Sequence, residues 1–143
     1  MKFSLFAFFI FSNFSLITAT HAEDIKEILI DNSAEAAVYL DSASIERKGD
    51  EVFCWITKKF ATAKKVKFIE EEIKYKKLFF MMNLELDRYS ILAVEYFDAY
   101  NEKVLEYSYP RKSNISEYQY NFPIYENSLE AKIMKAIEKL DGN

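Results

Sequence analysis

Near the middle of the chain, apolar and polar residues alternate in the way that a β-strand with one buried face requires. Every even position from Leu78 to Leu86 is apolar, whereas Asn83, Glu85 and Asp87 belong to the opposite face. The pattern predicts a strand whose even positions face the inside of the protein.

Strand and turn signals elsewhere extend this strand into an antiparallel sheet. Residues 25–30 and 35–40 form a first predicted hairpin around an Asp-Asn-Ser turn, and Gly49 supplies a positive φ in the link that follows. Residues 51–60 have apolar side chains on both faces, which indicates a central strand. Residues 61–77 are rich in lysine and give no clear strand signal.

The last third of the sequence predicts one more hairpin and one helix. Residues 89–97 and 103–109 form the hairpin, and Asn127 is the expected N-cap of the helix, with Glu130 completing a capping box and Gly142 past its end. The apolar stripe of this helix consists of Leu129, Ile133, Ile137 and Leu140. We therefore expect an α+β fold, a single antiparallel β-sheet of about six strands with a C-terminal α-helix packed on it.

The first 22 residues differ from the rest and resemble a secretory signal peptide. Lys2 gives a positive start, residues 3–11 are almost entirely apolar, and cleavage is expected after Ala22. An uncleaved anchor is the alternative, but polar residues interrupt the apolar run, and a spanning helix needs about 20 apolar residues. We expect one exported domain, residues 23–143, without a membrane span and located in the periplasm, at the cell surface or in the medium.

The charge of this domain narrows the classes of partner. Removal of residues 1–22 takes away Lys2 and His21, which leaves 18 basic and 23 acidic side chains and a net charge of −5. An acidic balance of this kind argues against a nucleic-acid partner.

The residue types that most catalytic sites need are scarce. The domain has no histidine, the commonest general base, and Gly49 and Gly142 alone cannot form a glycine-rich phosphate loop. One thiol without any imidazole does not favour a zinc site. Three consecutive glutamates, 70–72, are interpreted as a solvated charged edge rather than a catalytic pair. We expect no enzymatic activity, no cofactor and no metal.

Cys54 is the only cysteine, so the domain can form no internal disulfide and depends on packing. Its place inside an apolar strand predicts a small buried hydrophobic side chain. A disulfide between two chains is the alternative.

Two groups of side chains are candidate contact surfaces for a protein partner. A basic run in this acidic protein could dock an acidic partner or an anionic outer-membrane sugar, with a solvated loop as the alternative. It consists of Lys58, Lys59, Lys64, Lys65 and Lys67. Tyr118 and Tyr120 would share one strand face before the helix, where tyrosines suit either recognition or the covering of a small sheet.

The second face of the predicted sheet carries more large apolar side chains than one helix can cover. These are Phe53, Trp55, Phe79 and Met81. A homodimer that buries this face against its copy is therefore a further hypothesis.

Three stretches of the chain carry a pattern seen in a known family. Residues 39–49 read Tyr-Leu-Asp-Ser-Ala-Ser-Ile-Glu-Arg-Lys-Gly and lead into a strand with Trp55. The others are Tyr-Phe-Asp at 96–98 and Ser-Glu-Tyr-Gln-Tyr at 116–120. In order and spacing these stretches, which span roughly residues 39–140, resemble the surface-adhesin protein E family of bacterial exported domains.

The resemblance implies an antiparallel sheet with a C-terminal helix, exposure at the cell envelope, and adhesion to host extracellular proteins such as vitronectin and laminin. Family members often carry a cysteine pair where this chain has Leu84 and Glu138. The sequence thus predicts an exported, non-enzymatic, adhesin-like binding protein of the bacterial cell envelope that recognises another protein. A periplasmic or secreted inhibitor, or a structural envelope protein acting as a homodimer, is the alternative.

Overall fold

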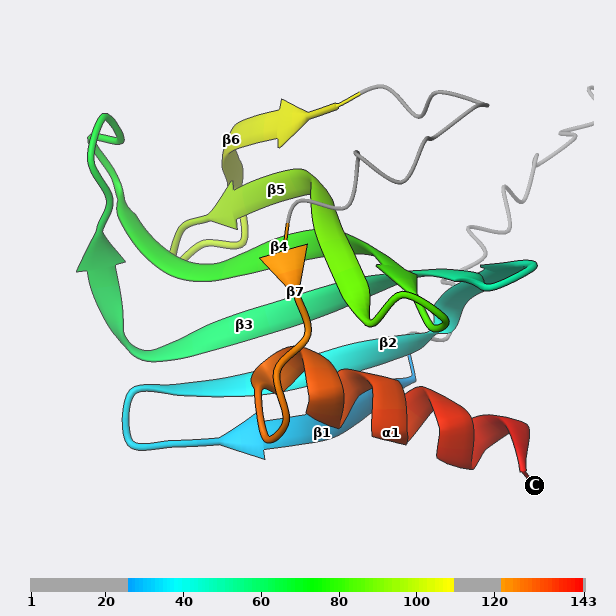
Figure 1. Ribbon diagram of the computed structural model, residues 1–143. Coiled ribbons are helices and arrows are strands. Elements are labelled where there is room, and N and C mark those ends of the chain that lie inside the picture. Colours follow the sequence, from blue (N-terminus) through cyan, green and yellow to red (C-terminus); the bar gives the residue numbers. More distant parts are fainter. Residues whose placement is uncertain (1–25, 110–121, 143) are drawn as a thin grey trace, which may run out of the picture.

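A computed structural model (Figure 1) describes residues 26–109 and 122–142. The signal peptide predicted at residues 1–22, and Tyr118 and Tyr120, lie outside this range. The elements of the described chain are β1 (Glu27–Asn32), β2 (Ala36–Lys48), β3 (Glu51–Lys65), β4 (Glu72–Asn83), β5 (Arg88–Phe97), β6 (Lys103–Ser108), β7 (Phe122–Pro123) and α1 (Leu129–Asp141).

The strands form one antiparallel sheet whose spatial order follows the sequence. It runs β1-β2-β3-β4-β5-β6, and the short β7 pairs with β5. In Figure 1 the sheet is strongly curved, with β1 and β2 at the bottom, β5 and β6 at the top, and α1 in front of the lower strands. The predicted α+β fold, with one antiparallel sheet and a C-terminal helix packed on it, is confirmed.

The main core lies between the sheet and α1, and β3 and β4 contribute most of it. Even positions of the two strands face each other in the pairs Val52–Met82, Cys54–Phe80 and Ile56–Leu78. The buried side chains of this helix-side core are Val38, Leu40, Val52, Cys54, Ile56, Leu78, Phe80, Met82, Ile133 and Ile137. Each such apolar side chain contributes about 1.5–3 kcal/mol when it leaves water. The central place of β3 agrees with its predicted two apolar faces.

The alternation predicted from Leu78 holds as far as Met82, but the strand ends at Asn83 instead of continuing to Leu86. The Asn83 side-chain oxygen accepts hydrogen bonds from the backbone N–H groups of Glu85 (3.1 Å) and Leu86 (2.8 Å). An asparagine side chain that bonds the backbone in this way favours a turn. Leu86 is consequently a turn residue and is 39% exposed.

Three strands extend beyond their sequence signals: β3 and β4 reach into residues 61–77, where no clear strand signal was found, and β2 passes its expected end at Leu40. β2 continues to Lys48 through an irregularity between Asp41 and Glu46, where we expected a link. The Ser44 hydroxyl closes this irregularity, because it donates to the Asp41 carbonyl (2.7 Å) and accepts from the Trp55 backbone N–H (2.8 Å). Gly49 then turns the chain with φ +61°, as predicted.

The N-cap of α1 is Ser128 rather than Asn127. The Ser128 hydroxyl accepts a hydrogen bond from the Ala131 backbone N–H at 3.2 Å, which satisfies one of the free donors of the first turn. Asn127 instead adopts a positive φ of 65°. Ile133 and Ile137 of the predicted stripe are buried, whereas Leu140 is 39% exposed.

The second face of the sheet carries a smaller apolar cluster. Phe53 and Met81 are opposite each other and are 3% and 1% exposed, so neither needs a second copy of the chain to leave water. The Trp55 and Phe79 rings stack beside them, with centroids 4.9 Å apart, and remain partly exposed. The predicted assignment of these side chains to the face opposite α1 is confirmed.

Cys54 is fully buried in the helix-side core, in agreement with the predicted hydrophobic role. Burial raises the pKa of its thiol from 9.0 to about 12. The folded state therefore keeps the proton at a pH where the unfolded chain loses it. The stabilisation that results is fully present below pH 9 and is lost as the pH rises from 9 towards 12.

We expect the Cys54→Ala variant to lose less stability than the wild type between pH 7 and pH 10. The difference should be about 1.4 kcal/mol, which corresponds to one pH unit above the unfolded pKa. Urea unfolding of both proteins at the two pH values measures this difference. Because the change with pH is taken within each protein, the pH-independent cost of the cavity left by the sulfur cancels. Equal losses in the two proteins would show that the thiol titrates alike in the folded and unfolded states.

Candidate binding surface on the hairpin of β3 and β4

The hairpin formed by β3 and β4 extends past the other strands and bends away from the sheet, at the upper left of Figure 1. Its register changes between the pairs Lys59–Tyr75 and Lys64–Ile73, so that β3 gains three residues over β4. Extra residues on one strand bend it and increase its twist. Ile73, which is fully buried, fixes the base of this projecting arm.

The tip of the arm presents a phenylalanine to solvent. Phe68 is 88% exposed and has φ +69°, a conformation that a bulky residue rarely adopts. The Lys67 ammonium lies 4.9 Å from the centre of its ring, and the Ile69 N–H donates to the Val66 carbonyl at 3.1 Å. The fold thus holds a large apolar side chain away from its own core, next to the charged side chain of Lys67.

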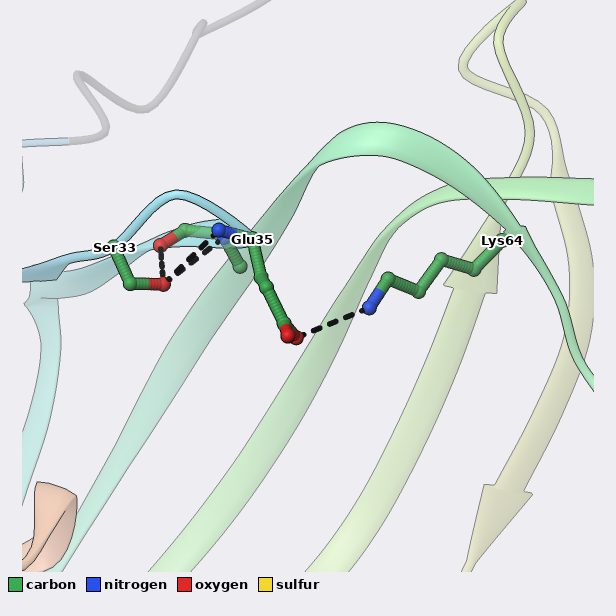
Figure 2. A network of polar contacts seen from close by, with 4 residues as sticks. Ser33, Glu35 and Lys64 are labelled. Carbon is green, nitrogen blue, oxygen red and sulfur yellow. Dashed lines mark hydrogen bonds and ion pairs between the residues drawn. The ribbon is translucent and has the colours of Figure 1, made fainter.

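Two of the predicted lysines make polar contacts at the arm, one to the β1–β2 turn and one within the arm itself. Lys64 forms an ion pair with Glu35 of the β1–β2 turn at 3.3 Å, and Figure 2 shows this contact together with the Ser33 hydroxyl that closes the turn. The Lys65 ammonium donates to the Glu70 carbonyl at 2.5 Å, across the loop. Exposed contacts of this kind add little stability.

The predicted basic run does not form one patch. Lys64, Lys65 and Lys67 lie at the end of the arm, whereas Lys59 lies on the sheet face opposite α1 and Lys58 on the face towards α1. Alternation along β3 explains the separation, because neighbouring residues of a strand point to opposite faces. Glu70, Glu71 and Glu72 are all exposed near the tip, so the end of the arm carries both signs of charge.

Lys59 belongs to a polar and aromatic surface on the face opposite α1. Its ammonium lies 2.7 Å from a carboxylate oxygen of Glu27 and 4.5 Å from the centre of the Tyr39 ring. Further along the same face, the Tyr75 and Phe97 rings stack with centroids 4.6 Å apart. Burial is the main reason that the pKa of Tyr75 is raised. This surface adjoins the base of the arm.

Sequence reasoning missed Phe68, Tyr75 and Phe97. Phe68 had one usable signal, its position as an aromatic residue inside a run of lysines and glutamates. The Tyr75–Phe97 stack joins two strands, and only the register between β4 and β5 reveals it.

Two shallow hollows border α1, with volumes of about 280 and 400 Å³. The larger lies between β1 and α1 and combines apolar side chains such as Ile28 and Leu140 with the lysines of the helix. Neither hollow is lined by histidine or cysteine. Within residues 26–109 and 122–142, no group of three or more metal-ligating side chains comes together, and no helix has the length and apolar character of a membrane span.

We expect Phe68→Ala to change the unfolding free energy by no more than about 0.5 kcal/mol, because the ring contributes little to the fold. Ile73→Ala in the same hairpin is the matched control and should lower it by about 2–5 kcal/mol. Urea unfolding monitored by circular dichroism measures both. A loss above about 1 kcal/mol in Phe68→Ala would mean that the ring supports the fold and would remove the tip from the candidate surface.

Comparison with known proteins finds no match to this chain among family models, curated proteins or solved structures.

Proposed function

We propose that this chain is an exported, non-enzymatic binding protein of the bacterial cell envelope, and that it recognises another protein through the tip of the β3–β4 hairpin. The observation that carries the proposal is Phe68, 88% exposed at the end of a projecting arm. Transfer of one phenylalanine side chain out of water contributes about 1.5–3 kcal/mol, which is the scale of a strong interface contact.

The neighbouring charges support recognition of a protein rather than of a uniform surface. Lys65 and Lys67 stand beside Glu70 and Glu71, so the tip offers positive and negative groups a few residues apart. Charges at the rim of an interface contribute mainly to orientation and to the rate of association. A partner with an apolar hollow flanked by both signs of charge would match this tip.

Export and location rest on the apolar segment at residues 1–22, and the adhesin-like role rests on the resemblance to the surface-adhesin protein E family. Host extracellular matrix proteins and envelope proteins are therefore the partner classes that we propose. Catalysis is left out of the proposal, because residues 23–143 contain no histidine and the thiol of Cys54 is buried.

The projecting arm also favours a second candidate function, the inhibition of an extracytoplasmic enzyme. An inhibitor needs little more than a protruding loop that fills the cleft of its target, and an exposed aromatic residue can fill a specificity pocket. Loss of a hydrolase activity on addition of the exported protein would favour this function over adhesion.

Phe68→Ser should weaken binding to a partner at least tenfold, since the loss of a buried aromatic contact exceeds about 1.4 kcal/mol. The exported protein and its variants can be tested on immobilised vitronectin, laminin and envelope extract. Leu86→Ser, at the opposite end of β4, is the control and should leave binding unchanged. Equal binding by wild type and Phe68→Ser would exclude the tip as the recognition site.

The exported protein should begin at Glu23, and protease added to intact cells should degrade it. Mass spectrometry of the native protein together with cell fractionation measures both properties. Retention of residues 1–22 would contradict cleavage, and protection from protease would exclude direct adhesion to a host surface. A protected, cleaved protein would direct the search to partners inside the envelope.

A further inference from the structure

Two lysines face each other directly in the middle of the sheet. Lys58 of β3 pairs with Lys76 of β4, one step beyond the buried pair Ile56–Leu78. Because side chains two residues apart share a strand face, both lysines lie on the side of the sheet that carries α1. Both are partly buried.

All other lysines of the described strands have a partner. Lys59 and Lys64 pair with glutamates, and Lys103 pairs with both Glu95 and Glu106. The remaining ones donate to a backbone carbonyl or lie over an aromatic ring, and they are Lys48, Lys65, Lys74 and Lys77.

Lys58 and Lys76 differ from these lysines. Within the described part of the chain, neither has a hydrogen bond, an ion pair or a ring contact. Burial and, after it, the charge of Lys58 lower the pKa of Lys76 from its ordinary value. Like charges directly opposite each other in an antiparallel pair destabilise a sheet. Among residues 26–109 and 122–142, no carboxylate pairs with either ammonium group.

We propose that Lys58 and Lys76 form a binding site for a phosphate group. Directly opposite side chains have Cβ atoms about 4.5–5.5 Å apart, so both ammonium groups can reach the oxygens of one phosphate. Lysine binds phosphate as a compact charge with three donors. Tyr96 of β5 is paired with Lys76 and shares the same face, which places a phenol as a third donor beside the two ammonium groups.

The charge of the site selects phosphate over a carboxylate. A phosphate monoester carries about −1.5 to −2 charges at neutral pH and neutralises both ammonium groups, whereas one carboxylate neutralises only one. The source is either free inorganic phosphate or a phosphate on a larger molecule. The site is separate from the hairpin tip, so the inference goes beyond the proposed function and does not depend on it.

The test is thermal unfolding of the exported protein in increasing inorganic phosphate, with sodium chloride added to keep the ionic strength constant. Binding to the folded state raises the unfolding midpoint along a saturating curve. General exclusion of salt from the protein surface raises it without saturation and in every variant. We expect a saturating rise for the wild type.

The double variant Lys58→Gln/Lys76→Gln should lose the saturating rise, and each single variant should bind phosphate about tenfold more weakly, as the loss of one charged hydrogen-bond donor predicts. Lys64→Gln/Lys74→Gln removes the same charge from the same hairpin and should respond like the wild type. In chloride alone the first double variant should have the higher midpoint of the two, because it removes a repulsive pair. Its failure to respond therefore cannot be attributed to misfolding.

A comparison of inorganic phosphate, glycerol 3-phosphate and acetate distinguishes the possible sources of the phosphate group. Tighter binding of glycerol 3-phosphate than of inorganic phosphate supports a phosphorylated molecule as the source, and the reverse order supports the free ion. A saturating rise of equal size in acetate would overturn the phosphate assignment, as would an equal response in Lys58→Gln/Lys76→Gln or none in the wild type. Phe68→Ser should keep the phosphate response, so that failure of this inference and failure of the proposed function can be told apart.

Discussion

The contact of two isoleucines of α1 with one face of the sheet is the interaction on which the rest of the structure depends. Ile133 and Ile137 are buried in one cluster with side chains of β2, β3 and β4, and a chain with Cys54 as its one cysteine has no internal disulfide that could add to the stability of this core. Hydrophobic burial is therefore the dominant stabilising term. The cap at Ser128, and the ion pair of Lys132 with Asp31 at 2.6 Å, hold the helix over that face. Because β3 and β4 are fixed at their centres, their far ends can leave the sheet as one arm.

Most of the fold could be predicted from residues whose periodicity has one interpretation. The alternation in Val52–Ile56 and Leu78–Met82 placed both strands and both of their faces, and the stripe in 129–140 placed the helix. The errors occurred where a polar side chain bonds the backbone. The hydrogen bond from the Leu86 N–H to the Asn83 side chain ends β4 before Leu86. The hydrogen bond from the Trp55 N–H to the Ser44 hydroxyl keeps β2 paired through a stretch that the sequence predicts to be a link. Neither bond can be inferred from hydropathy.

The candidate site was harder to predict, because it depends on pairing across strands. The lysine run was visible in the sequence, but strand alternation and the longer β3 distribute it over the arm and both faces of the sheet. The sequence places Lys58 beside Lys59, whereas the fold places it opposite Lys76. Contact between residues 18 positions apart requires the register of the hairpin, which lysine-rich strands leave unspecified.

The three additional residues of β3 also separate the strand register of the arm from the strand register of the core. An odd surplus exchanges the two faces of β3 relative to β4, so the pairing beyond Lys64–Ile73 is independent of the pairs that bury the helix-side core. The structural effects of changes in the length or composition of residues 65–71 should consequently not extend past the pair Lys64–Ile73 into the core. The molecule has the properties of a scaffold, in which one loop can be exchanged for another and acquire a new specificity while the sheet beneath it stays the same.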